Sequence, residues 1–208
     1  MPDYDKKIKK LLRSLKPEIE SYLKQTLSKH RFEHTCRVAK TAKKYAKKLS
    51  LDPYKAELSA LLHDIAKELS NEKLLEVARQ KNILLDEVDY KNPHVLHARV
   101  GAEIAREKYG IDDPDVLGGI RCHTLAEPNM TRLSMAVYLA DATEPERERK
   151  LAAPVRKTLK EKGLEYAVLH AIDSKLIHII NKNKVIHPIT IKARNWLIES
   201  ILQPTKPQ

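Results

Sequence analysis

An imidazole and a carboxylate stand side by side at His63 and Asp64, inside a run of apolar residues with helical spacing. The apolar positions follow the pattern of a helix that packs one face into a core: Leu58, Leu61, Leu62, Ile65, Ala66 and Leu69. A carboxylate on that face is costly to bury unless a cation neutralises it. Because histidine and aspartate both bind metal ions well, the pair predicts a metal site. A lone His-Asp dipeptide is more often a surface pair or contains a core histidine, so the prediction depends on further ligands.

Two other segments supply those ligands. Residues 31–49 read as an amphipathic helix, and His34 lies one turn before Val38 on its apolar stripe. A third apolar helix face, between Leu133 and Ala140, is followed directly by Asp141. Three helices therefore direct side chains toward one core, and the predicted metal ligands are His34, His63, Asp64 and Asp141. Two imidazoles and two carboxylates suit iron, manganese, zinc or magnesium.

Helical periodicity and capping signals recur along almost the whole chain, and no segment alternates as an exposed strand does. We therefore predict an all-α fold, a helical bundle. Pro17, Pro145 and Pro154 are predicted to break or interrupt helices, and a polar loop is expected over residues 86–93. The predicted helices cover residues 5–29, 31–49, 54–69, 70–82, 94–109, 114–123, a segment that begins at 128–131 and carries Asp141, 163–181 and 190–202.

The length of 208 residues is enough for one domain, or slightly more, with a sizeable core. We predict a basic helical extension over residues 1–29 packed on a metal-binding domain over 30–202, followed by a tail over 203–208. Cys36 and Cys122 form no CxxC motif and are expected to be reduced. The N-terminus lacks an apolar signal core and no apolar stretch approaches the ~20 residues that span a bilayer. We therefore expect a cytoplasmic protein with no membrane contact.

The formal net charge of +11 is concentrated near the N-terminus. Residues 1–55 hold 16 Lys and Arg against 6 Asp and Glu, a net charge of +10. A solvated helix face explains much of this excess, and a positive field that steers nucleotides toward a cleft is a second reading. Non-specific binding to nucleic-acid phosphates is a third. Because no recognition motif or aromatic stacking platform accompanies the charge, a nucleic-acid partner is not expected.

Several stretches, in the same order along the chain, carry a resemblance to a known family. They are residues 30–34 (HRFEH), 61–67 (LLHDIAK), 97–102 (HARVGA), 119–124 (GIRCHT), 128–130 (PNM), 139–145 (LADATEP) and 187–196 (HPITIKARNW). The H…HD…D pattern resembles the signature of the HD-domain phosphohydrolases. The HDxxK, HxxVGA, RxHT and ADxxEPxR boxes together resemble its YqeK-type branch, the symmetrical diadenosine tetraphosphate hydrolases.

This resemblance implies an HD-domain helical bundle that splits diadenosine tetraphosphate symmetrically into two ADP, with iron or another divalent ion as cofactor. A metal at the four predicted ligands would polarise a phosphoryl group and activate water. Asp64 is also the candidate for orienting the attacking water. The other candidate catalytic residues are Lys67, His97 and His123. The two histidines could bind the transferred phosphate, protonate the leaving ADP or ligate a second ion.

A polyphosphate substrate also needs cations and polar groups that are not metal ligands. Lys67 follows His63 by one helical turn, and Arg31 precedes His34 by one turn. The resemblance adds Arg147 from the ADxxEPxR box and Thr124 from the RxHT box, with Arg121 as a further candidate. It also places adenosine recognition at the loop that contains His187, Pro188 and Thr190. The remaining four histidines are expected to be structural or exposed: His30, His94, His170 and His178.

Two alternatives remain open from the sequence. One is another HD-type nucleotide phosphohydrolase or a cyclic nucleotide phosphodiesterase. The other is a basic RNA-associated module with a vestigial site. The chain departs most from the family pattern between Arg147 and Gly163, and its N-terminus carries the extra basic helix. Formation of a homodimer is compatible with the sequence and is not determined by it.

Overall fold

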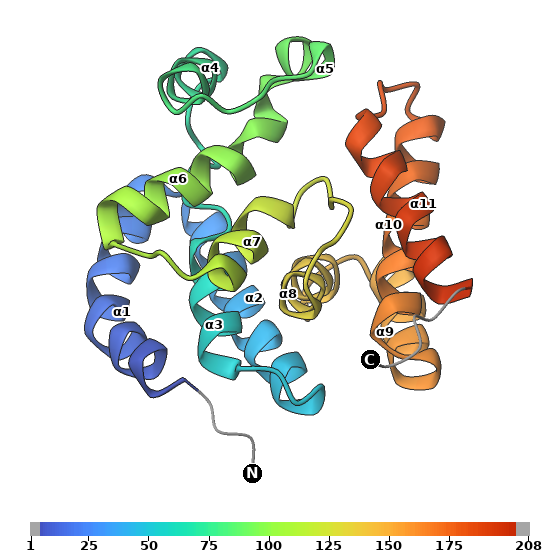
Figure 1. The fold of residues 1–208 in the computed structure, drawn as a ribbon, viewed down its shortest axis with the longest axis horizontal. Helices are drawn as coiled ribbons and strands as arrows, with labels where there is room; N and C mark the ends of the chain where they lie inside the picture. The colour runs from blue at the N-terminus through green and yellow to red at the C-terminus, as the bar shows by residue number, and fades with distance from the viewer. Residues whose placement is uncertain (1–4, 203–208) are drawn as a thin grey trace.

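The computed structural model describes residues 5–202, which form eleven α-helices and one 3-10 helix with no strand among them. The all-α bundle predicted from the sequence is therefore confirmed (Figure 1). In chain order the elements are α1 (Lys6–Thr26), α2 (Lys29–Lys48), α3 (Pro53–Leu62), α4 (Asn71–Gln80), α5 (Glu87–Lys91), η1 (Pro93–Leu96), α6 (His97–Tyr109), α7 (Pro114–Cys122), α8 (Arg132–Thr143), α9 (Arg149–Lys162), α10 (Leu164–Asn181) and α11 (Pro188–Leu202). The tail predicted over residues 203–208 lies outside this described range.

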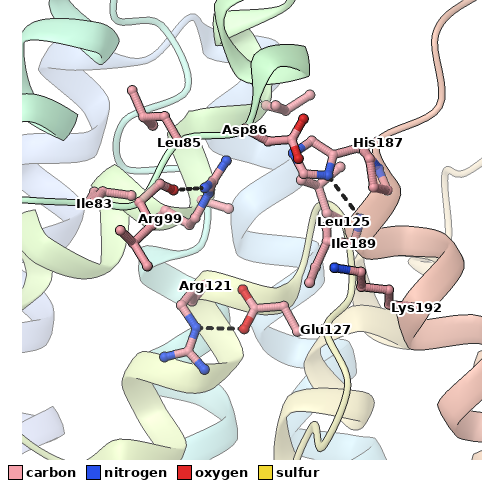
Figure 2. A pocket seen from close by; sticks show the side chains of 14 residues that line it. Ile83, Leu85, Asp86, Arg99, Arg121, Leu125, Glu127, His187, Ile189 and Lys192 are labelled. Carbon is pink, nitrogen blue, oxygen red and sulfur yellow. Dashed lines mark hydrogen bonds and ion pairs between the residues drawn. The ribbon is translucent and has the colours of Figure 1, made fainter.

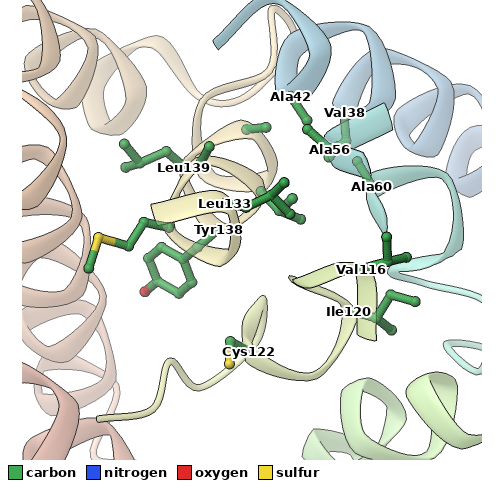
Figure 3. Close-up of a cluster of buried hydrophobic side chains, with 14 of the residues drawn as sticks. Val38, Ala42, Ala56, Ala60, Val116, Ile120, Cys122, Leu133, Tyr138 and Leu139 are labelled. Atoms are coloured by element: carbon green, nitrogen blue, oxygen red, sulfur yellow. The ribbon is translucent and has the colours of Figure 1, made fainter. Parts of the chain in front are cut away.

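Helices α2, α3, α7 and α8 form the centre of the bundle, where each packs against at least two of the others. α3 and α8 are buried along nearly their whole length, as expected for helices with other elements on every side. Figure 3 shows the interior that they share with α2 and α7. The labelled side chains there are Val38, Ala42, Ala56, Ala60, Val116, Ile120, Cys122, Leu133, Tyr138 and Leu139.

Gly119 allows α3 and α7 to approach each other closely. A Cβ atom at Gly119 would lie 2.2 Å from the Ser59 hydroxyl oxygen, and that hydroxyl donates to the Val116 carbonyl at 2.9 Å. Only glycine fits where two helices approach this closely. The contact fixes the relative position of the two helices whose C-terminal ends carry His63 and His123.

The N-terminal helix α1 packs against α2 and α3 through an apolar stripe formed by Ile8, Leu12, Ile19 and Leu23. The predicted break at Pro17 is wrong, because α1 continues through that residue. Buried side chains on both sides of Pro17 hold the helix together despite the missing backbone donor. Buried Glu57 adds a polar tie, since it accepts hydrogen bonds from Lys16 of α1 at 2.7 Å and contacts Lys43 of α2 at 2.5 Å.

Helices α9, α10 and α11 form a group at the right of Figure 1, in contact with the centre through α8. The interruption predicted at Pro154 is wrong, because α9 runs through it with Ala152 and Val155 buried on either side. Pro145 does lie between α8 and α9, as predicted. Pro188 occupies the first position of α11, where its missing N–H costs nothing.

Helix α4 and the 3-10 helix η1 pack on the end of α6 around a second small cluster of Ala66, Leu74, Ala78, Leu96 and Val100, and α5 packs against η1. The loop predicted over residues 86–93 is wrong in part, because α5 forms there. A capping box between Asp86 and Asp89 satisfies the first backbone donors of this short helix. The helix predicted from residue 94 begins as η1 and continues as α6 from His97.

Candidate metal centre

The helix predicted over residues 54–69 ends at Leu62, so His63 and Asp64 lie at a helix end and not inside a helix. Tight turns follow, with the Ile65 N–H donating to the Leu62 carbonyl and the Lys67 N–H donating to the Asp64 carbonyl. The His63 ring caps this end of the helix, because its Nδ1 lies 2.7 Å from the Ala60 carbonyl oxygen. That carbonyl belongs to the last turn of α3, where backbone carbonyl groups have no N–H partner within the helix.

Three imidazoles are oriented in the same way by backbone carbonyls three residues earlier. Nδ1 lies 2.7 Å from Ala60 O in His63, 2.5 Å from His94 O in His97 and 2.7 Å from Ile120 O in His123. A carbonyl oxygen can only accept, so each Nδ1 carries the hydrogen. Burial lowers the pKa of both His97 and His123, which favours neutral rings in this pair. Nε2 is then a bare acceptor in His97 and His123.

His34 is oriented by a carboxylate. Its Nδ1 lies 3.2 Å from Glu144 Oε1, and Arg37 Nε donates to Glu144 Oε2 at 2.8 Å. Burial opposes ionisation of Glu144, but the hydrogen bonds from Arg37, the Glu146 backbone N–H and His34 together outweigh it, and the pKa of Glu144 is lowered. An ionised Glu144 accepts from Nδ1, which leaves Nε2 of His34 facing the two aspartates. Such carboxylate–histidine pairs typically orient metal ligands.

The two predicted carboxylates lie among these Nε2 atoms. Asp64 Oδ2 is 3.3 Å from His63 Nε2 and 4.0 Å from His34 Nε2, while Asp64 Oδ1 is 3.5 Å from His97 Nε2 and 3.6 Å from His123 Nε2. Asp141 Oδ1 is 3.0 Å from His34 Nε2 and 3.9 Å from His63 Nε2. The structure thus brings together all four residues that the sequence singled out as ligands, with His97 and His123 on the other side of Asp64.

This arrangement fits a divalent cation. His63 Nε2 is buried and has no hydrogen-bond partner among the described residues. The ligand atoms of His34, His63 and Asp141 lie within 4.8 Å of one another, and so do those of His63, Asp64 and His123. Burial alone would raise the pKa of Asp64, but the neighbouring histidines hold it well below its usual range. The C-terminal ends of α3 and α7 both point into the site, and their partial negative charge favours a cation there.

Three basic side chains border the centre. Arg31 Nη1 is 3.0 Å from Asp64 Oδ2, and Lys67 Nζ is 3.2 Å from His97 Nε2. Arg147 donates to the Asp141 carbonyl oxygen at 2.7 Å and also contacts the Asp141 carboxylate. All three were predicted from the sequence as anion-binding groups. Burial lowers the pKa of Lys67.

Thr124 and Lys175 complete the border next to His97 and His123. Thr124 Oγ1 lies 2.9 Å from His97 Nε2 and 3.0 Å from His123 Nε2. The Lys175 ammonium donates to the Thr124 carbonyl oxygen, and burial lowers the pKa of Lys175 to about 8. Sequence reasoning missed Lys175. A signal existed, since Lys175 continues the buried positions Ala167 and Ala171 of α10 at four-residue spacing.

The C-terminal loop residues line a different cavity. His187 and Pro188 border a cavity of about 600 Å³ together with Arg99, Arg121 and Leu125 (Figure 2). His187 Nε2 lies 3.3 Å from Asp89 Oδ1, and the Thr190 hydroxyl donates to the Leu125 carbonyl at 2.8 Å. Arg121 faces this cavity and pairs with Glu127 at 2.9 Å. The structure therefore places His187 and Pro188 at this cavity, while Thr190 is hydrogen-bonded to Leu125, which lines it. These contacts lie outside the imidazole cluster.

Comparisons with known proteins agree with this geometry. Residues 31–146 match the family model of the HD domain. A Bacillus subtilis protein named symmetrical bis(5'-nucleosyl)-tetraphosphatase is 35% identical over 176 residues, which cover 85% of this chain and 94% of that protein. A Staphylococcus aureus protein of the same name is 30% identical and covers 83% of this chain and 89% of its own length.

A solved structure is similar in fold as well as in sequence. It is described as a predicted HD superfamily hydrolase involved in NAD metabolism from Clostridium acetobutylicum. The two structures superpose with a TM-score of 0.84 at 37% sequence identity, covering 88% of this chain and 96% of the other. Among residues 5–202, no helix is both long enough and apolar enough to cross a membrane. The chain belongs to the HD-domain family, in the branch that contains the proteins named symmetrical bis(5'-nucleosyl)-tetraphosphatase.

Proposed function

We propose that this protein is a metal-dependent hydrolase that splits diadenosine tetraphosphate at its middle and releases two ADP. His34, His63, Asp64 and Asp141 hold the metal ion, for which iron is the first candidate and manganese, zinc and magnesium are the alternatives. The observation that carries the proposal is the convergence of these four side chains from α2, the end of α3 and α8, with a buried His63 Nε2 that has no hydrogen-bond partner among the described residues. The names of the relatives support the substrate.

When bound, the ion would polarise a phosphoryl oxygen and lower the pKa of a coordinated water. The chain's own residues bind and position the substrate. Arg31, Lys67 and Arg147 provide positive charge around the two aspartates, where a tetraphosphate must enter. Asp64 lies between the other predicted metal ligands and the pair of His97 and His123. The Asp64 carboxylate oxygen that does not bind the metal is placed to orient a water molecule. Thr124 supplies a hydroxyl beside His97 and His123.

The orientation of His97 and His123 favours one of the roles that the sequence left open. Because both rings present a bare Nε2, they suit ligation of a second ion better than hydrogen-bond donation to phosphate. Asp64 Oδ1 lies within 3.6 Å of both Nε2 atoms, so Asp64 would help His97 and His123 to hold such an ion. Metal analysis distinguishes the two cases. Two ions per wild-type chain, falling to one in the His123→Asn variant, support the second ion. One ion in both proteins contradicts it.

The product assay tests the proposed function. Purified protein with added Fe²⁺ or Mn²⁺ is incubated with diadenosine tetraphosphate, and the nucleotides are separated by anion exchange. Release of ADP alone supports the proposal. ATP with AMP indicates asymmetric cleavage, and no turnover together with salt-sensitive RNA binding indicates the RNA-associated module; either result overturns it.

A further inference from the structure

Cleavage at the middle of a dinucleoside tetraphosphate places constraints on the site. The bond that breaks lies between two identical halves, so an ADP unit extends from the metal centre in each of two directions. The inference below rests on the proposed function and concerns where one of these halves binds.

A cavity of about 370 Å³ opens directly onto the metal centre between α8, α9 and α10. It shares four residues with that centre and its border: His123, Asp141, Arg147 and Lys175. Its volume lies within the ~300–1,000 Å³ that ligand pockets occupy. By contrast, the lining of the larger cavity beside His187 includes none of the clustered histidines and aspartates.

The walls of the α8–α10 cavity suit a flat heterocycle attached to a sugar. Tyr138, Val155 and Ala171 provide a buried apolar surface. Leu151 of α9 adds an apolar side chain to the cavity wall and is 47% exposed. Ser174 and His178 of α10 add polar groups that can pair with ring nitrogens or ribose hydroxyls.

The positively charged side chains of the cavity lie next to the metal centre. Arg147 and Lys175 lie at the inner end, next to Asp141 and Thr124, where phosphates would approach the metal centre. Ser174 and His178, one helical turn apart on α10, line the same cavity, as does the Glu148 carboxylate. A ligand whose phosphates lie beside Arg147 and Lys175 and whose nucleoside contacts the remaining wall matches this lining.

We propose that the α8–α10 cavity binds one nucleoside of the dinucleoside substrate, with Arg147 and Lys175 on the phosphates that join it to the metal centre. The other half of the substrate extends in the opposite direction. Each ADP product then occupies a separate part of the site, one of them in the α8–α10 cavity. The metal-loaded protein therefore binds two ADP molecules.

The test fills the cavity from a half-buried position. Ser174→Trp places a large ring in the proposed nucleoside position and leaves every predicted metal ligand in the sequence. Ile177→Trp is the matched control, since Ile177 lies on the same helix, is 58% exposed and does not line the cavity. Calorimetric titration with ADP counts the sites, and the KM for diadenosine tetraphosphate measures the effect on substrate. Circular dichroism and thermal melting confirm that each variant is folded.

Wild type and Ile177→Trp are expected to bind two ADP, and Ser174→Trp one, with a KM at least about tenfold higher. If Ser174→Trp does not fold, Leu151→Ser removes apolar wall at an exposed position and is expected to weaken ADP binding at one site. Unchanged ADP binding and unchanged KM in the folded variant would overturn the proposed cavity. Wild-type protein that releases no ADP from diadenosine tetraphosphate would instead reject the proposed function, so the two failures are distinct.

Discussion

The Nε2 atoms of His97 and His123 lie 3.1 Å apart, although both rings already donate Nδ1–H to backbone carbonyls. Two bare acceptors at this distance repel each other unless a positive group lies between or beside them. Lys67 donates to His97 and the Thr124 hydroxyl can donate its single hydrogen to His123, so each ring has a donor within reach. Both Nε2 atoms carry no hydrogen of their own and can bind a metal ion in place of these donors, beside the candidate group of His34, His63 and Asp141.

Asp64→Asn should abolish metal-dependent hydrolysis while it preserves the fold. Asparagine keeps the shape of the side chain but removes the negative charge that lies among four histidines. We expect kcat/KM to fall about a hundredfold or more, with unchanged circular dichroism. Full activity in this variant would refute the role of Asp64.

Glu144 is predicted to act through His34. Its carboxylate holds the His34 ring by Nδ1 and is itself held by Arg37. Glu144→Gln should weaken metal affinity by about 10- to 100-fold, measured by competition with a fluorescent chelator. Glu146→Gln is the matched control, because Glu146 pairs with the same Arg37 at 3.0 Å but its side chain is 65% exposed. Equal effects of the two substitutions would show that Glu144 has no positioning role.

The lowered pKa of Lys175 predicts that the protein loses affinity for its substrate above pH 8. Burial lowers its pKa to about 8 despite the attraction of Asp141, so the ammonium is present below that pH and is lost above it. KM for diadenosine tetraphosphate should therefore rise as the pH passes 8. In Lys175→Arg the rise should vanish, because guanidinium stays charged. An identical pH profile in both proteins would contradict this role.

The same pKa shift has a consequence for stability. The pKa of Lys175 is lower in the folded chain than its ordinary value of 10.5, so between about pH 8 and 10.5 the unfolded chain binds more protons. The contribution of Lys175 to the free energy of unfolding therefore increases with pH across this interval, and burial of its charge is unfavourable below pH 8.

The sequence singled out His34, His63, Asp64 and Asp141 because all four lie on or directly after apolar helix faces, and the structure brings them together; their binding of a metal stays a prediction. A polar residue in such a position points toward the core, whatever the exact arrangement of the helices. Lys175 and Glu144 were missed as functional residues, since their roles depend on where α10 and the end of α8 lie relative to the centre. The end of α3 at Leu62 had no glycine or proline signal. It coincides with the hydrogen bond from the His63 ring to the Ala60 carbonyl.

The proline predictions failed for the opposite reason. Pro17 and Pro154 carry the usual signal of a helix break, but buried residues on both sides keep α1 and α9 continuous. Tertiary packing outweighs the loss of one backbone hydrogen bond there. Pro145 lies after the end of α8 and before the start of α9, so it separates the two helices as expected.

Gly119→Ala should destabilise the fold and displace the end of α7. The added Cβ would meet the Ser59 hydroxyl at 2.2 Å, so we expect a loss of about 1–3 kcal/mol in urea unfolding. Ser59→Ala/Gly119→Ala should recover part of the loss, because it removes the nearest atom. Gly118→Ala is the control, with a contact of 3.1 Å to the Ser134 hydroxyl and a smaller expected loss. No difference between the two single variants would show that the α3–α7 contact can relax freely.

The most direct test of the metal centre is anomalous diffraction from crystals grown with Fe²⁺ or Mn²⁺, with data collected at the absorption edge of the metal. We predict a peak about 2.0–2.3 Å from His34 Nε2 and His63 Nε2, in contact with carboxylate oxygens of Asp64 and Asp141. A peak elsewhere in the molecule, or none at these four side chains in an active preparation, would contradict it.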